Sequence, residues 1–133
     1  MTPDDRGQAN HKPLTGVRVV VVEDHLDTRE ILDQCLRYEG AVVTAVPTAR
    51  EALAAVGQAD VIVTDFLLNG AREDGAWLLE LVNQQPRPIP VIVLTGVAEV
   101  HSPRLAQAPF ACKLLKPLDP WDLSGEILKI VRG

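Results

Sequence analysis

Short continuous runs of hydrophobic residues alternate along this chain with longer stretches in which hydrophobic residues recur at helical spacing. The continuous runs predict five strands, at residues 17–22, 41–46, 60–64, 91–94 and 110–114. Unbroken hydrophobicity, in contrast to strict alternation, is typical of parallel strands that are covered on both faces. A stretch with a hydrophobic stripe follows each run and predicts a helix. Five repeats of strand and helix predict an α/β protein, with helices on both faces of an open parallel sheet.

The expected helices begin and end at residues with suitable capping chemistry. Four of them follow a short polar side chain that accepts a hydrogen bond from the first helical turn, namely Asp27, Thr48, Asp74 and Asp119. Asp27 also has Glu30 three residues later, which is the spacing of a capping box. Gly40 follows the first helix, at a position where glycine commonly ends a helix.

The length of 133 residues fits a single domain, which we expect to span residues 17–133. Residues 1–16 are polar, contain two prolines and two glycines, and lack periodicity, so we expect a disordered N-terminal arm. The net charge of −5 gives no basic surface for nucleic acid, and no hydrophobic run approaches the roughly 18 residues of a membrane helix. The two cysteines have neither metal-binding nor redox spacing. These features predict a cytoplasmic protein with no direct contact to nucleic acid or membrane.

Polar residues follow four of the five expected strands at their carboxyl ends. Glu23 and Asp24 follow the first strand, Asp65 the third, Thr95 the fourth and Lys116 the fifth. Five parallel strands with right-handed crossovers commonly adopt the flavodoxin-like, doubly wound order 2-1-3-4-5. That order sets the first strand beside the third, and the fourth and fifth strands follow in turn. The sequence therefore predicts that these five residues meet at one edge of the sheet.

Three of these residues are carboxylates, which repel one another unless a cation lies between them or their pKa values rise. Mg²⁺ is a suitable cation because it prefers oxygen ligands and keeps several waters. We expect Asp24 and Asp65 to bind it directly and Glu23 to bind it through water. The backbone carbonyl of Leu67, in the loop after the third strand, is a further expected ligand.

Asp65 is the residue that we expect to react. A carboxylate can attack phosphorus and form an acyl phosphate. The oxygens of a phosphoryl group in transfer need positive charge and hydrogen-bond donors around them. Mg²⁺ supplies positive charge on one side, Lys116 supplies it on another, and the Thr95 hydroxyl can donate to a third oxygen. Asp65 is therefore the predicted phosphoacceptor.

The chain resembles the receiver domains of two-component response regulators over about residues 17–131. The resemblance rests on four motifs in the family's order and spacing, VVVVEDHLDTREIL, VIVTDFLL, VIVLTG and LLKPL. It implies a cis bond between Lys116 and Pro117, and phosphorylation of Asp65 by a histidine kinase or a phosphotransfer protein. It further implies that phosphorylation shifts a two-state surface made by the fourth helix, the fifth strand and the fifth helix. That surface would bind an output partner or a second copy of the chain.

Three positions depart from the family pattern. Lys113 stands where the family usually has an aromatic switch residue, and Phe110 would face the opposite side of a regular strand. The loop after Asp65 is about two residues longer than usual and has Asn69 in place of the usual proline. The fourth helix contains Pro103 and few hydrophobic anchors, so we expect it to be short or distorted.

Four functions are compatible with parts of this pattern. A phosphorylatable signalling module, which is not an enzyme beyond slow self-dephosphorylation, agrees with all five site residues. A degenerate receiver, regulated by protein contacts without phosphorylation, agrees with Lys113. A haloacid-dehalogenase-type phosphatase would need a second Asp at the position of Leu67, and an FMN carrier would need a phosphate-binding loop where Glu23 and Asp24 lie.

Overall fold

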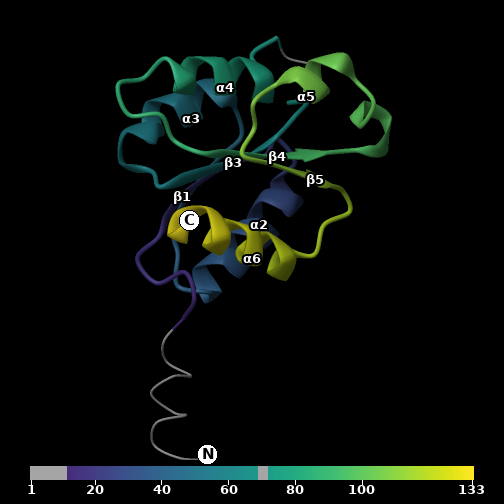
Figure 1. Cartoon of the computed structure of the whole chain (residues 1–133). Helices are drawn as coiled ribbons and strands as arrows, with labels where there is room; N and C mark the ends of the chain where they lie inside the picture. The colour runs from purple at the N-terminus through teal and green to yellow at the C-terminus, as the bar shows by residue number, and fades with distance from the viewer. Residues whose placement is uncertain (1–11, 69–71) are drawn as a thin grey trace, which may run out of the picture.

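The computed structural model describes residues 12–68 and 72–133. The described part contains one five-stranded parallel sheet in the order β2-β1-β3-β4-β5, which is the predicted order (Figure 1). Its strands are β1 (Arg18–Val22), β2 (Val42–Val46), β3 (Val61–Asp65), β4 (Val91–Thr95) and β5 (Cys112–Leu115). The helices are α2 (Leu26–Tyr38), α3 (Ala49–Ala55), α4 (Gly75–Asn83), α5 (Pro103–Gln107) and α6 (Pro120–Arg132), with short 3-10 turns η1 (Val56–Gln58) and η2 (Val97–Glu99). The flavodoxin-like α/β fold is thus confirmed.

The helices form two layers, with α2 and α6 on one side of the sheet and α3, α4 and α5 on the other (Figure 1). Residues in β1 alternate between them: Val19 and Val21 belong to the hydrophobic core under α2 and α6, and Val20 and Val22 to the core under α3 and α4. All four valines are buried, so both faces of β1 are covered. Each such side chain contributes roughly 1.5–3 kcal/mol by leaving water. The continuous hydrophobic runs therefore follow from the two-sided core.

Residues 12–16 correct the expectation of a disordered arm that extends to residue 16. Leu14 is completely buried within the core under α2 and α6. Its backbone N–H donates to the carbonyl of Glu39 at 2.8 Å, and the N–H of Gly16 donates to the carbonyl of Gly40 at 3.3 Å. Leu14 is the single leucine in a polar stretch, and its partner lies at the end of α2. The local sequence pattern does not indicate this contact. Residues 1–11 lie outside the described residues.

Three of the four expected N-caps are confirmed. Thr48 accepts a hydrogen bond from the N–H of Glu51, Asp74 accepts from two N–H groups of α4, and Asp119 accepts from the N–H of Trp121. The expected cap at Asp27 is wrong, because α2 begins at Leu26 and His25 is its N-cap residue. Asp27 instead lies in the first turn, where its charge favours the helix dipole.

The stretch expected to form a short or distorted fourth helix is divided in two. The turn η2 follows Gly96, whose N–H donates to the side chain of Glu99 at 3.1 Å. Helix α5 has only five residues, and Pro103 stands in its first turn, where proline is tolerated because no N–H is needed. Proline thus begins this helix and does not bend it.

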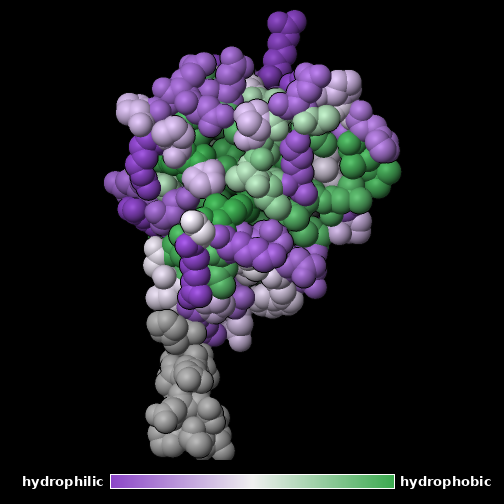
Figure 2. Space-filling view, in the orientation of Figure 1, coloured by the Kyte–Doolittle hydropathy of each residue, from purple (hydrophilic) through white to green (hydrophobic). Residues whose placement is uncertain are grey.

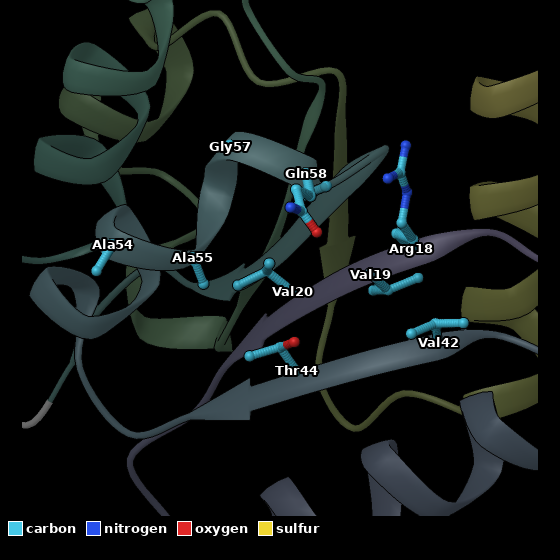
Figure 3. A pocket seen from close by; sticks show the side chains of 10 residues that line it. Arg18, Val19, Val20, Val42, Thr44, Ala54, Ala55, Gly57 and Gln58 are labelled. Carbon is cyan, nitrogen blue, oxygen red and sulfur yellow. The ribbon is translucent and has the colours of Figure 1, made fainter.

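The described part of the surface has a hydrophobic area and a hollow. Figure 2 shows hydrophobic surface across the middle of the face on which β5 and α6 lie, and exposed large hydrophobic side chains include Leu115 and Trp121. A hollow of about 440 Å³ lies over the first half of β1 and β2 and beside the end of α3 (Figure 3). Arg18, which lines it, begins β1, so the hollow lies at the opposite end of this strand from Glu23. None of the described helices is long and hydrophobic enough to span a membrane.

Candidate functional site

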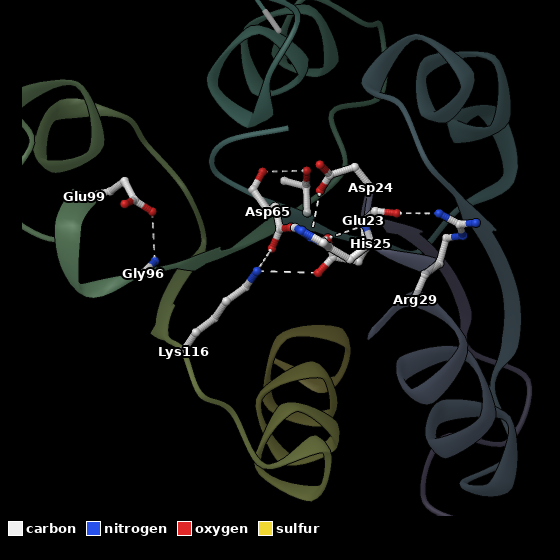
Figure 4. Close-up of polar contacts among 9 residues, drawn as sticks. Glu23, Asp24, His25, Arg29, Asp65, Gly96, Glu99 and Lys116 are labelled. Atoms are coloured by element: carbon white, nitrogen blue, oxygen red, sulfur yellow. Dashed lines mark hydrogen bonds and ion pairs between the residues drawn. The ribbon is translucent and has the colours of Figure 1, made fainter. Parts of the chain in front are cut away.

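The carboxyl ends of β1 and β3 bring the predicted acidic residues together. Val22 pairs with Thr64 in the parallel ladder, so the next residues, Glu23 and Asp65, lie side by side. Asp24 follows Glu23 at the same edge (Figure 4). Glu23 and Asp65 are both almost completely buried, whereas the side chain of Asp24 is 15% exposed. The strand order thus produces the acidic cluster that the sequence predicts.

Lys116 reaches this cluster from the end of β5. Its Nζ lies 2.5 Å from Oδ1 of Asp65 and 3.5 Å from Oε1 of Glu23 (Figure 4). The backbone places it there, because the N–H of Lys116 donates to the carbonyl of Thr95 at 2.8 Å. The Lys116–Pro117 peptide bond is cis, as the family resemblance implies. One ammonium group therefore faces two buried carboxyl groups.

Burial and mutual repulsion set the protonation of this cluster. Burial raises the pKa of Asp65 to about 8, and the neighbouring Glu23 adds to the rise while Lys116 opposes it. Burial also acts to raise the pKa of Glu23, but hydrogen bonds with Asp65 and with the N–H of His25 outweigh it and lower that pKa to about 2. Burial lowers the pKa of Lys116, but its contacts with Asp65 and Glu23 raise it overall. Burial and the neighbouring carboxyl group thus hold the pKa of Asp65 well above its usual range.

The donor atoms in this cluster fit a divalent cation. One ligand atom from each of Glu23, Asp24, His25 and Asp65 lies within 4.8 Å of the others. Within the described residues, Oδ1 of Asp24 is buried and accepts no hydrogen bond, and Oδ1 of Asp65 accepts none with good geometry despite its short distance to Lys116. A buried carboxylate oxygen without a donor is costly unless a cation faces it. The acidic cluster therefore offers carboxylate oxygens for a hard cation such as Mg²⁺, among them Oδ1 of Asp24, which has no hydrogen-bond donor.

His25 belongs to this cluster although the sequence analysis did not select it. Its Nδ1 lies 3.5 Å from an oxygen of Glu23 and 3.5 Å from Oδ1 of Asp24. The signal in the sequence was its position directly after the acidic pair at a strand end. The backbone N–H of His25 also donates to Glu23, which orients that carboxylate.

Thr95 lies at the same edge of the sheet, and Leu67 lies in the loop that follows Asp65. Thr95 ends β4, is 3% exposed, and donates its hydroxyl to the carbonyl of Gly96 at 3.3 Å. Its hydroxyl hydrogen bond is thus local. Leu67 follows Asp65 by two residues, and its side chain is exposed. The role of the Leu67 carbonyl as a metal ligand stays a prediction, and Asn69 lies outside the described residues.

Lys113 and Phe110 lie on the α5 side of the sheet. Lys113 is exposed, and its Nζ donates to the carbonyl of Ala106 in α5 at 3.2 Å. The ring of Phe110 packs edge-on against Phe66 at a centroid distance of 6.5 Å. The expectation that Phe110 faces the opposite side from Lys113 is wrong, because β5 begins at Cys112 and strand alternation does not extend back to Phe110.

Comparison with known proteins identifies relatives along nearly the whole chain. Residues 19–128 match the family model of the response regulator receiver domain. A 14.6 kDa protein of Leptolyngbya boryana, described as uncharacterized, is 34% identical over 115 residues, which cover 83% of this chain and 86% of that protein. The transcriptional regulatory protein TcrA of Mycobacterium tuberculosis is 37% identical over 85 residues, covering 62% of this chain and 33% of TcrA. The match thus spans about a third of that longer regulator.

Solved structures have the same architecture. A putative response regulator from Chloroflexus aurantiacus superposes with a TM-score of 0.79 and 26% identity, covering 90% of this chain and all of that one. The receiver domain of the sensor histidine kinase PA1611 from Pseudomonas aeruginosa, solved with a magnesium ion in its active site cleft, has a TM-score of 0.78 and 23% identity, covering 90% of this chain and all of that one. The strand order, the acidic cluster with its lysine, and the family match over residues 19–128 lead to one assignment. This chain belongs to the response regulator receiver domains of two-component systems.

Proposed function

We propose that this chain is a phosphoacceptor module in which Asp65 takes a phosphoryl group from a phosphohistidine of a histidine kinase or a phosphotransfer protein. The observation that carries the proposal is the ion pair of Lys116 with the buried Asp65, beside a carboxylate cluster that has unsatisfied oxygens. A buried carboxyl group without a chemical role would be an unfavourable feature of a small domain. In a two-component receiver, the lysine and the acidic residues act together on the phosphoryl group.

Mg²⁺, held by Asp24, Asp65, Glu23 through water and the carbonyl of Leu67, would neutralise negative charge on the phosphoryl oxygens. Charge neutralisation in the cluster also favours the ionised form of Asp65, which is the nucleophile. A carboxylate oxygen of Asp65 forms the new O–P bond as the P–N bond of the donor histidine breaks, and the donor imidazole keeps the electron pair of that bond. Lys116 faces Asp65 directly and stabilises charge on the transferred group.

The Thr95 hydroxyl lies at the end of the neighbouring strand and can exchange its local hydrogen bond with Gly96 for one to a phosphoryl oxygen. The proposed output is a shift of the surface formed by α5, β5 and α6, which then binds a partner or a second copy of the chain. In this role the protein is a switch, and its own catalysis is limited to slow hydrolysis of the acyl phosphate.

Labelling by a small phosphodonor tests the acceptor. Wild-type protein, incubated with Mg²⁺ and radiolabelled acetyl phosphate, should gain up to one equivalent of acid-stable, base-labile label, and Asp65→Asn should gain none. Asp60→Asn is the matched control, because Asp60 is a partly exposed carboxylate that follows α3 and pairs with Arg18. Equal labelling of wild type and Asp65→Asn would show that Asp65 is not the phosphoacceptor. A folded wild type without label from acetyl phosphate or from a histidine phosphodonor would support the degenerate receiver instead.

A further inference from the structure

Helix α5 is tied to the start of α4 by an ion pair in which one guanidinium nitrogen contacts both oxygens of a carboxylate. Nη2 of Arg104 donates to both carboxylate oxygens of Asp74, at 3.0 and 3.3 Å. Asp74 is 3% exposed and also accepts hydrogen bonds from the N–H groups of Ala76 and Trp77. The Arg104 side chain is 60% exposed, so solvent screens the pair from one side, but its carboxylate is buried and accepts charged hydrogen bonds. This contact therefore links α5 to the start of α4.

The carboxylate that Arg104 binds is directly linked to the phosphoacceptor segment. Gly75, the residue after Asp74, donates its N–H to the carbonyl of Phe66 at 3.0 Å. A Cβ atom at Gly75 would overlap the carbonyl oxygen of Asp65, so the two backbones are in close contact. A displacement of Asp65 or Phe66 therefore moves the Asp74–Gly75 pair.

The same arginine contacts the residue that follows Asp65. The Arg104 guanidinium lies over the ring of Phe66, 5.4 Å from its centroid, which is within the range of a cation–π interaction. Phe66 is buried and shares a small hydrophobic cluster with Val93 and Leu105, against which Phe110 packs. Arg104 and Leu105 are adjacent residues of α5, so one short helix contacts Phe66 by a charged and a hydrophobic group.

Lys113 provides a second attachment of α5, from β5. Its Nζ donates to the carbonyl of Ala106, near the carboxyl end of the helix, where a positive charge also suits the helix dipole. At this position, where the resemblance implies an aromatic switch, the chain has a residue that binds α5 through hydrogen bonding. Arg104 and Lys113 together attach a five-residue helix to the β3–α4 loop and to β5.

We propose that Arg104 is a positioning residue that couples α5 to Asp65: it holds α5 against the Asp74–Gly75 pair, so that rearrangement of the segment after Asp65 on phosphorylation is transmitted to the output surface. This proposal rests on the proposed function for its last step, because it concerns how phosphorylation of Asp65 reaches α5. Its first step, the attachment of α5 in the unphosphorylated protein, is independent of phosphorylation.

Amide hydrogen exchange measured by mass spectrometry tests both steps in the full chain. In the unphosphorylated protein, Arg104→Ala should speed exchange of the α5 amides roughly tenfold, because breaking charged hydrogen bonds makes local opening easier. Arg104→Lys should restore only part of the protection, since lysine lacks the planar guanidinium that lies over the ring of Phe66. Arg87→Ala is the matched control: Arg87 is similarly exposed and pairs with Asp60, away from α5. Exchange in Arg104→Ala equal to that in Arg87→Ala would overturn the attachment.

Beryllofluoride with Mg²⁺, which mimics the acyl phosphate, tests the coupling. Wild type and Arg87→Ala should change exchange in both the β3–α4 loop and α5, whereas Arg104→Ala should keep the loop change and lose at least half of the α5 change. A full α5 response in Arg104→Ala would overturn the coupling. Asp74→Asn, which keeps the N-cap but removes the charge, should behave like Arg104→Ala, and combining the two should add little. Absence of any beryllofluoride response in wild type would count against the proposed function, and the exchange data without beryllofluoride would still decide the attachment.

Discussion

At the scale of single residues, the carboxyl group of Asp65 is buried at an electrostatic cost. Its carboxyl group is buried beside the carboxylate of Glu23, and its pKa is raised to about 8. Lys116 offsets this cost only in part, since burial and the second carboxyl group act against it. The folded protein therefore contains a site that is more stable when a proton, a metal ion or a neutral substitute relieves the repulsion.

The stability of the metal-free protein should depend on the charge of Asp65. Because the folded state holds this proton more tightly than the unfolded state, where the ordinary pKa is 3.8, the free energy of unfolding should fall as the pH rises from about 4 to about 8. The lowered pKa of Glu23 acts in the opposite direction, but only below about pH 4.5. Asp65→Asn has no carboxyl group to ionise at this position. Its free energy of unfolding should therefore exceed that of wild type by an amount that grows as the pH rises from about 4 to about 8. Urea unfolding of both proteins in EDTA at several pH values measures this difference.

Mg²⁺ provides the control for this experiment. Saturating Mg²⁺ should stabilise wild type more than Asp65→Asn and should flatten the pH dependence of wild type, because the cation lowers the pKa of Asp65. A constant stability difference between the two proteins across the pH range would show that Asp65 does not carry the raised pKa.

His25 should affect which metal the cluster prefers. Its imidazole nitrogen lies 3.5 Å from two carboxylates, and imidazole suits first-row transition metals better than Mg²⁺. His25→Ala should weaken Ni²⁺ binding roughly fivefold and Mg²⁺ binding less than twofold, as measured by calorimetric titration. His101→Ala removes another exposed imidazole, on the loop before α5, and should change neither affinity. Equal losses for the two ions in His25→Ala would exclude a direct imidazole contact.

At the scale of elements, the junction between β3 and α4 determines how the acceptor is held. Asp74 begins α4, and Gly75 approaches the backbone of Asp65 so closely that a side chain does not fit. The helix start is thus packed against the end of the strand that carries the reactive carboxyl group. Such contact explains why glycine follows the capping aspartate here.

Two glycines allow a matched test of this junction. Gly75→Ala should destabilise the fold by roughly 1–3 kcal/mol, because the new methyl group overlaps the backbone oxygen of Asp65. Gly125→Ala, at an open position of α6, should instead stabilise it by roughly 0.5–1 kcal/mol through helix propensity. Denaturant unfolding measures both, and labelling by acetyl phosphate should decline in Gly75→Ala alone. A neutral Gly75→Ala with full labelling would contradict the close contact.

At the scale of the whole molecule, the strand order assembles the site from residues far apart in the chain. Lys116 and Glu23 are separated by 93 positions, yet they meet because β1, β3, β4 and β5 are consecutive neighbours in a parallel sheet. The same sheet separates α2 and α6 from α3, α4 and α5 (Figure 1). The order of the strands therefore determines both which residues meet at the site and which helices cover each face of the sheet.

Much of this architecture was predictable because its determinants are local. Hydrophobic runs followed by polar residues identified the strands and the positions of Asp65 and Lys116, and short polar side chains identified three helix starts. The cap at Asp27 could not be separated from the start at Leu26, because both residues are compatible with a helix at that point. Leu14 was missed because its partners lie at the end of α2, beyond any local pattern.

The sequence by itself determined the alternation of strands and helices, the chemistry at each strand end and, through the rules of parallel sheets, the meeting of Glu23, Asp24, Asp65, Thr95 and Lys116. Only the tertiary structure decided the protonation of the carboxyl pair, the place of His25 beside it, and the ion pair between Arg104 and Asp74. The physical reason is that strand formation and capping depend on neighbouring residues. A pKa or an ion pair across 30 residues depends on burial and on which side chains meet after folding.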